Sequence, residues 1–290
     1  MGHRARIAAV AGLAALVVAS PAAAQEDARE KRLVAAVGPS VVQLVEKDRD
    51  RTGRQGTGFF VREDGVVATN HHVVAGADYP MFAVLRDGRS VRVLGVLSDD
   101  PVHDVALVRV EGSGYPALPV APLESIHDGQ RIMLMGSPMG FGGSVFFGTL
   151  SAIRSEMPDE WKKRNARVGN LTQGPFVQHS IAAGPGSSGS PLLDMDGRVV
   201  GVNHSGVEGV EIGFGAHASL LKDLMARTDY AAKPTPIGPD VKKNLLVSGG
   251  VLGGAAALGL GVWLFVRWRG RARDDDGDDD DDEEGEPTVH

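Results

Sequence analysis

The sequence predicts an all-β fold of two packed, six-stranded antiparallel β-barrels. Glycine is abundant, at 39 of 290 residues, and much of it lies in turn-like contexts. The apolar runs are short, at about four to seven residues, which is the usual length of a strand. Several runs are separated by Asp-Gly pairs at 64–65, 87–88 and 196–197, and such pairs favour tight hairpins.

The expected strands form two consecutive groups, and this order favours two barrels over alternating strands and helices. The first barrel is expected at about 35–120 and the second at about 121–220, with a closing amphipathic helix at 219–228. With a short helix at 27–38, the whole domain covers 25–230. The expected strands are 40–45, 57–62, 66–69, 81–85, 91–97 and 105–110, then 131–136, 144–154, 176–180, 191–193, 199–203 and 212–216.

The N-terminus has the pattern of a secretory signal peptide over residues 1–24. Arg4 and Arg6 precede an apolar run at 7–19, and three alanines end at Ala24. The run is too short to cross a bilayer, which needs about 20 apolar residues. We expect cleavage after Ala24, and an uncleaved N-terminal anchor is the alternative.

A second apolar segment, at 245–266, predicts one transmembrane helix. Its 22 residues carry no charge, and that length suffices to span the hydrocarbon core. Two lysines precede it and four arginines follow, which places the C-terminus in the cytoplasm and the folded domain outside. A buried core helix is the alternative, and the charged flanks disfavour it. A proline-containing linker at 231–244 leads into this helix, and the tail at 267–290 is basic, then acidic, and expected to be disordered.

The predicted membrane helix contains two overlapping GxxxG spacings, Gly249 with Gly253 and Gly250 with Gly254. Such spacings allow two helices to approach closely. Homo-oligomerisation through this helix is one interpretation. Simple tolerance of small residues is the other.

The charge distribution excludes a nucleic-acid-binding domain. The net charge of −7 comes from the tail, where residues 274–286 hold eleven carboxylates. Residues 25–243 carry 24 basic and 26 acidic side chains, so the folded domain has no basic field. Cysteine is absent, which rules out disulfides and thiolate metal sites. No histidine lies in an H-E-x-x-H pattern, so we expect neither a metal site nor a cofactor.

Three segments carry groups suited to nucleophilic catalysis. Ser188 lies in a glycine- and serine-rich turn, which can expose a hydroxyl and aim backbone N–H groups at an oxyanion. His72 follows an apolar strand and could act as a general base, and Asp104 precedes another strand and could orient an imidazole. Considered one at a time, each residue has an alternative interpretation without catalysis: Ser188 as a loop serine, His72 as a packed or surface histidine, and Asp104 as a turn residue. Their order and their division between the two strand groups favour one shared site between the barrels.

With these motifs, the chain resembles the Deg/HtrA-type trypsin-like serine proteases over about residues 33–226. The resemblance is carried by 56–60 (GTGFF), 69–74 (TNHHVV), 100–107 (DPVHDVAL) and 186–192 (GSSGSPL). It implies a trypsin-like fold and polypeptide substrates. It further implies that His72 is the general base, Asp104 its orienting carboxylate and Ser188 the nucleophile. The N–H groups of Gly186 and Ser188 would form the oxyanion hole.

The chain also departs from the family pattern. His71 and Ser187 each stand where the family commonly has asparagine, and Ser190 replaces a later glycine. No PDZ domain is expected after Thr228, so assembly through PDZ domains is not expected either.

One wall of the pocket for the side chain before the cleaved bond is expected at Asn203, His204 and Ser205. These residues would favour a polar or acidic side chain. The alternative is that His204 faces away from the pocket.

These expectations combine into a membrane-anchored serine endopeptidase that acts outside the cytoplasmic membrane, in the periplasm. It would serve envelope protein quality control or regulated proteolysis. The alternative is a catalytically silent, protease-like binding or sensor module, because fold alone does not fix function. Replacing Ser188 with alanine separates the two, since it removes cleavage without removing the module.

Overall fold

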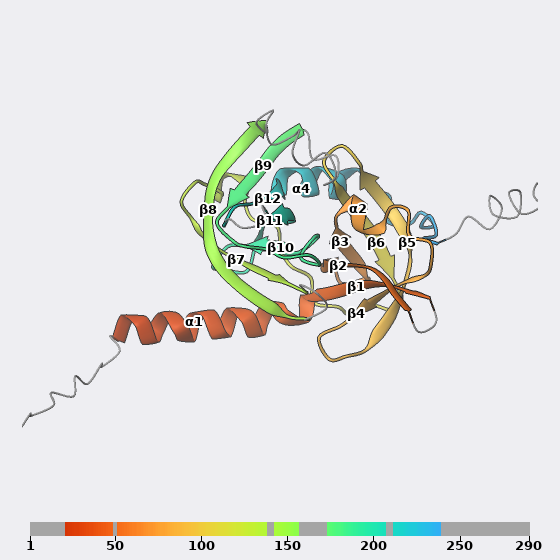
Figure 1. Cartoon of the computed structure of the whole chain (residues 1–290), viewed down its shortest axis with the longest axis horizontal. Coiled ribbons are helices and arrows are strands. Elements are labelled where there is room, and N and C mark those ends of the chain that lie inside the picture. The colour runs from red at the N-terminus through yellow and green to blue at the C-terminus, as the bar shows by residue number, and fades with distance from the viewer. Residues whose placement is uncertain (1–20, 49–50, 138–141, 157–172, 207–210, 239–290) are drawn as a thin grey trace, which may run out of the picture. The chain divides into compact units, whose positions relative to one another are not determined.

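The computed structural model describes residues 21–48, 51–137, 142–156, 173–206 and 211–238 (Figure 1). The described part of the chain, which ends at Gly238, lies in one compact unit. Most of the predicted signal peptide, and the whole of the predicted transmembrane helix and acidic tail, lie outside the described residues. Among the residues that are described, no helix is both long and apolar enough to span a bilayer.

The expected pair of six-stranded antiparallel barrels is confirmed. The first closes in the order β1-β2-β3-β6-β5-β4 and the second in the order β10-β11-β12-β9-β8-β7. Neighbouring strands pair antiparallel throughout both barrels. The first barrel comprises β1 (Val41–Asp48), β2 (Arg51–Arg62), β3 (Val66–Thr69), β4 (Met81–Val84), β5 (Ser90–Asp100) and β6 (Val105–Val110). The second comprises β7 (Arg131–Gly136), β8 (Ser144–Glu156), β9 (Gln173–His179), β10 (Pro191–Leu193), β11 (Val199–Gly206) and β12 (Gly213–His217).

Several strands are longer than the apolar runs that predicted them. β5 continues to Asp100, because Asp99 and Asp100 pair with β6 through their backbones although their side chains are polar. β2 begins earlier for the same reason, since its polar start at Arg51 pairs with β1. Backbone pairing does not require an apolar side chain.

Helices are few in the described part of the chain. They are α1 (Pro21–Val37), α2 (His71–Val74) and α4 (Ala218–Arg227), with 3-10 turns η1 (Gly38–Ser40) and η2 (Leu123–Ser125). The expected N-terminal helix begins earlier than predicted, so α1 runs through the expected cleavage point after Ala24. α2 is a single turn that the sequence did not predict, and its two valines are buried.

The apolar parts of β2 and β3 lie between two apolar clusters, and their successive side chains point alternately into one cluster and the other. Phe60 and Val67 point into the first barrel, whereas their neighbours Phe59 and Ala68 point into a separate apolar cluster. That second cluster also contains Met133 from the other barrel. Successive side chains of a strand point to opposite faces, so both faces of these strands are buried: one in a barrel interior, one between the barrels.

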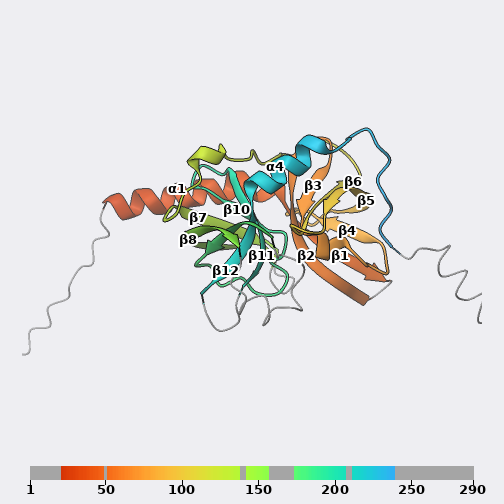
Figure 2. The same cartoon turned by 90° about the horizontal axis from the view of Figure 1, so that it is seen from above.

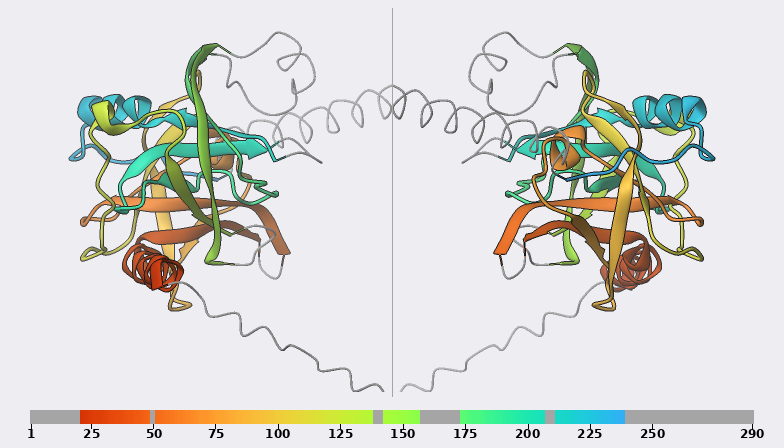
Figure 3. Two further views of the ribbon diagram at one scale, coloured as in Figure 1. Left: turned by 90° about the vertical axis from the view of Figure 1, so that its left-hand side faces the viewer. Right: turned by 90° about the vertical axis from the view of Figure 1, so that its right-hand side faces the viewer.

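Two helices cover parts of this core. α4 packs on β6 of the first barrel and on β11 and β12 of the second, and it lies across their junction when seen from above (Figure 2). α1 lies elsewhere on the surface (Figure 3), where Leu33 and Val37 join the cluster between the barrels. Arg131 pairs with Glu26 and Glu30 of α1, so charged contacts also hold this helix on the second barrel.

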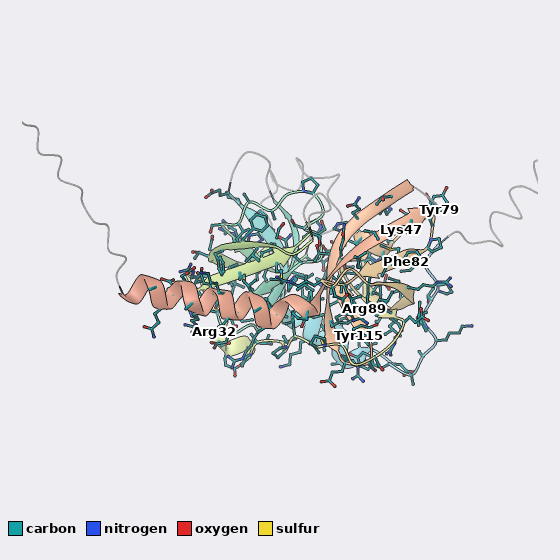
Figure 4. The ribbon with its side chains drawn as sticks, turned by 90° about the horizontal axis from the view of Figure 1, so that it is seen from below. Arg32, Lys47, Tyr79, Phe82, Arg89 and Tyr115 are labelled. Atoms are coloured by element: carbon teal, nitrogen blue, oxygen red, sulfur yellow. The ribbon has the colours of Figure 1, made fainter. Side chains whose placement is uncertain are left out.

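We predict that Phe60→Ala destabilises the first barrel. Phe60 is fully buried and stacks on Tyr115, with ring centroids 4.2 Å apart. Figure 4 labels Tyr115 at the first barrel. Removing a buried phenylalanine leaves a cavity and costs about 3–5 kcal/mol. Urea unfolding of the purified chain should show a loss of this size, whereas Leu94→Ala, at a side chain that is 42% exposed, should change stability little. Equal losses in both variants would contradict the assigned packing.

Candidate active site

Asp104 lies at the end of a tight turn that joins β5 to β6. Its φ of 54° is the only positive value at a non-glycine position among the described residues, and aspartate tolerates this conformation better than most residues. The turn is held by Asp100, whose carboxylate accepts the backbone N–H groups of Val102 and His103. The Asp104 side chain is buried at 1% exposure, so the turn delivers a carboxylate into the protein interior.

The α2 turn brings His72 onto this carboxylate. The backbone N–H of His72 donates to Asp104 Oδ1 at 2.9 Å, and Nδ1 lies 2.7 Å from Oδ2. Because a carboxylate only accepts hydrogen bonds, Nδ1 carries the proton and Nε2 is left as an acceptor. Asn70 and the N–H of His71 donate to the Asp104 carbonyl, which fixes the turn and α2 together. The His72 side chain remains 36% exposed, as a general base requires.

A second histidine reaches the same carboxylate, and the sequence did not predict this. Nε2 of His204, on β11, lies 3.0 Å from Asp104 Oδ2. Burial alone raises the pKa of the Asp104 carboxyl, but its interactions with His204 and His72 outweigh burial and hold that pKa well below the ordinary value. Asp104 is therefore an anion throughout the neutral pH range.

Ser188 lies on a loop before β10 whose backbone is fastened on several sides. Thr57 of β2 donates from Oγ1 to the Gly186 carbonyl at 2.9 Å and from its N–H to the Ser188 carbonyl at 2.8 Å. Gly189 has a φ of 83°, and a Cβ there would meet the Thr57 carbonyl, so glycine is required by both conformation and space. The first barrel thus directly positions the loop that carries the expected nucleophile.

Ser188 is partly exposed, and its hydroxyl donates to the His204 carbonyl at 2.9 Å. Between residues that the structure describes, no hydrogen bond joins this hydroxyl to His72, and none uses the N–H of Gly186 or Ser188 as donor. Those two N–H groups remain available for a ligand. This availability is what an oxyanion hole needs, and the assignment of Gly186 and Ser188 to that role stays a prediction.

Asn203 lies behind the nucleophile loop. Its Nδ2 donates to the Ser187 carbonyl at 2.8 Å, and its Oδ1 lies 3.0 Å from Nε2 of His179. Nδ1 of His179 accepts the N–H of Ile181, so Nε2 carries the proton donated to Asn203. Burial lowers the pKa of His179 to about 4, which keeps this imidazole neutral.

These contacts correct the expected pocket wall. Asn203 and His204 are buried residues, at 1% and 2% exposure, and their side chains point to Ser187 and Asp104. Neither lines an open pocket, so the polar or acidic preference inferred from them has no support here. The alternative, in which His204 faces away from the pocket, fits the structure. The side chain of Ser205 lies outside the described residues.

One group of side chains in the described part of the chain could hold a metal ion: His72, Asp104 and His204, with ligand atoms within 4.8 Å of one another. Both imidazole nitrogens already lie at hydrogen-bond distance from the carboxylate. A hydrogen bond accounts for the His72 contact.

Two closed barrels with an Asp–His pair between them define a trypsin-like peptidase domain. A family model described as "Trypsin-like peptidase domain" matches residues 56–202, about half of the chain, and the chain belongs to this family. The predicted resemblance to Deg/HtrA-type proteases is confirmed by relatives and by solved structures.

The chain is 38% identical over 157 residues to a "Probable periplasmic serine endoprotease DegP-like" of Pseudomonas putida (strain GB-1), covering 54% of this chain and 30% of the relative. It is also 38% identical over 148 residues to a protein of the same description from Halomonas elongata, covering 51% and 28%. The chain therefore spans less than a third of the length of these relatives.

Among solved structures, "HtrA-type protease AlgW with tripeptide" is similar, with a TM-score of 0.58 and 27% identity, over 68% of this chain and 62% of that one. A serine endoprotease from Yersinia pestis has a TM-score of 0.57 at 23% identity, over 68% and 65%. The second likeness bears on the fold alone.

We predict that His179 makes stability depend on pH in mildly acid solution. Its folded pKa of about 4 lies below the unfolded value of about 6.5. Between these values the unfolded state binds more protons, so stability falls as pH falls, by about 1.4 kcal/mol per unit. Urea unfolding between about pH 6.5 and 4.5 should show this slope in the wild type, and His179→Gln should flatten it.

His127→Gln is the matched control, because His127 is exposed. It should keep the wild-type slope. An unchanged slope in His179→Gln would show that the buried imidazole is not what titrates.

Proposed function

We propose that the chain is a serine endopeptidase that uses Ser188, His72 and Asp104. The observation that carries the proposal is the 2.7 Å contact between His72 Nδ1 and the buried Asp104 carboxylate. This contact fixes the tautomer in which Nε2 can accept a proton. Membership of the trypsin-like peptidase family and the endoprotease relatives support the same activity.

In the proposed reaction, the Ser188 hydroxyl leaves the His204 carbonyl and attacks a peptide carbonyl. His72 Nε2 accepts the hydroxyl proton, and Asp104 stabilises the imidazolium that forms. The N–H groups of Gly186 and Ser188 donate to the oxyanion. His72 then protonates the leaving amine, and water releases the acyl group from Ser188 in a second, equivalent cycle.

The proposed place of action is outside the cytoplasmic membrane. The N-terminal pattern of a signal peptide and the apolar segment at 245–266 support a single-pass anchor with a cytoplasmic tail. Two relatives are described as periplasmic, which agrees with proteolysis of polypeptides in the envelope. Homo-oligomerisation through the GxxxG spacings belongs to the same proposal.

A second candidate function is a protease-like module that binds polypeptides without cleaving them. One observation favours it: the Ser188 hydroxyl is hydrogen-bonded to the His204 carbonyl. A serine held in that position is not yet activated by a base. The two candidates differ in whether this arrangement is a resting state or a permanent one.

We predict that a fluorophosphonate probe labels Ser188 in the full-length chain in membranes. Ser188→Ala and His72→Ala should abolish labelling, and Asp104→Asn should lower the peptidase kcat by about 10⁴-fold because His72 loses its required tautomer. Ser187→Ala removes a neighbouring hydroxyl that is buried, and labelling should persist. Folded wild-type chain that neither reacts nor cleaves casein would favour the binding module.

A further inference from the structure

We propose that Arg54 determines specificity on the leaving-group side of the site, by binding an acidic side chain one or two positions after the cleaved bond. This inference rests on the reaction proposed above. Arg54 is an exposed residue of β2, and its Nη1 donates to the His72 carbonyl at 3.2 Å. A Cβ built on Gly76, just after α2, would lie 3.8 Å from its Nη2. The guanidinium, which is always charged, therefore lies beside the proposed general base.

The leaving fragment lies on the His72 side of the site in the proposed reaction. The acyl fragment stays attached to Ser188, whereas His72 protonates the amine of the fragment that leaves. β2 passes between these two groups, because a Cβ built on Gly56 would meet Val73 of α2 at 2.7 Å and the Ser188 carbonyl at 3.3 Å. Arg54 comes just before Gly56 and reaches α2. Its charge is thus next to the part of the substrate that follows the cleaved bond.

A buried carboxylate fixes the backbone at Arg54. Gly53 and Arg54 of β2 stand opposite the single residue Glu46 of β1, which makes a β-bulge. Glu46 is 4% exposed, and its Oε2 accepts the N–H of Arg54 at 2.9 Å. Its Oε1 accepts the N–H groups of Asp78 and Tyr79, in the segment between α2 and β4, at 2.6 and 2.8 Å. One carboxylate thus ties Arg54 to the segment that follows α2.

Glu46 holds this backbone as an anion. Burial raises the pKa of its carboxyl, but the backbone hydrogen bonds and the charge of Arg54 outweigh burial and hold that pKa below its ordinary value. Both carboxylate oxygens accept backbone N–H groups. Glu46 therefore positions the backbone of Arg54 and leaves the guanidinium to other partners.

No close carboxylate neutralises the Arg54 guanidinium within the described ranges. The ion pairs found there join other residues, and the side chain of Arg54 donates to a backbone carbonyl instead. A guanidinium prefers a carboxylate, which it can bind through two parallel hydrogen bonds. An aspartate or glutamate of the substrate would supply that carboxylate.

The experiment identifies the residues that follow the bonds cut by the full-length chain in detergent micelles. A library of synthetic peptides with mixed sequence is cleaved, and the products are identified by mass spectrometry. The readout is the ratio of acidic residues to their amides, asparagine and glutamine, at the first two positions after each cut, corrected for the library composition. In the wild type this ratio should be about two- to fivefold above one, and it should fall as salt is added, because the contact is an exposed ion pair.

Variants at one position separate the charge from the contact with His72. Arg54→Gln should bring the ratio to about one, whereas Arg54→Lys should keep it above one because the charge remains. Arg92→Gln is the matched control, since Arg92 is another exposed arginine of the first barrel, on β5, and it should keep the wild-type ratio. A loss of rate that all peptides share divides out of the ratio.

Two results of this experiment would overturn the proposal. One is a wild-type ratio of about one. The other is a wild-type ratio that persists in Arg54→Gln. If Arg54→Gln cleaved all peptides more slowly at the wild-type ratio, Arg54 would only support the end of α2, and the proposal would fail as well.

A second readout does not depend on cleavage. The same library is passed over immobilised full-length Ser188→Ala chain, and the retained peptides are identified. Acidic peptides should be enriched, and Arg54→Gln, added to Ser188→Ala, should remove the enrichment while added Arg92→Gln keeps it. Enrichment that persists without Arg54 would overturn the contact. If the wild type cleaves nothing but the enrichment depends on Arg54, only the proposed function fails. If it cleaves without an acidic preference, only this inference fails.

Discussion

The charge of Asp104 has to be compensated by hydrogen bonds, because its side chain is almost completely removed from water. Two hydrogen bonds from His72 supply this compensation, and Nε2 of His204 adds a close contact at 3.0 Å. They come from α2 of the first barrel and from β11 of the second. Loss of either source would leave a buried charge only partly satisfied, which is costly. The Asp104 carboxylate, which orients the imidazole of His72, therefore also helps to hold the two barrels together.

Much of this architecture could be predicted from the sequence. The strands between the barrels read as short apolar runs because both of their faces are buried, as Phe59 and Phe60 show. Asp-Gly pairs marked the turns at Gly65, Gly88 and Gly197, where the structure has positive φ values. The Asp–His pair could be inferred from local motifs, since His72 and Asp104 each adjoin a strand that is easily recognised.

Other features had no local signal. In the pairing of β11 with β12 the register shifts between Asn203 and Ser205, so His204 is the extra residue of a β-bulge. That register is a property of the folded sheet. The contacts of Asn203 reach His179 and Ser187, which lie 24 and 16 residues earlier in the chain. A polar pair at the end of a strand is as compatible with a pocket wall as with a buried network. The low exposure of Asn203 and His204 favours the buried network over the pocket wall. The burial of a single polar residue cannot be predicted from its neighbours in the sequence.

Thr57, on β2 of the first barrel, makes hydrogen bonds that link the two barrels. Its hydroxyl accepts the N–H of Ser137 and donates to the Gly186 carbonyl, and its own carbonyl accepts the hydroxyl of Thr69. One small side chain thus joins the strand of one barrel to two loops of the other. Both partners in the second barrel are backbone groups, so these bonds depend on the conformation of the two loops and on a threonine at position 57. A barrel taken from a homologue is therefore expected to fit only where that threonine and those loop conformations are shared.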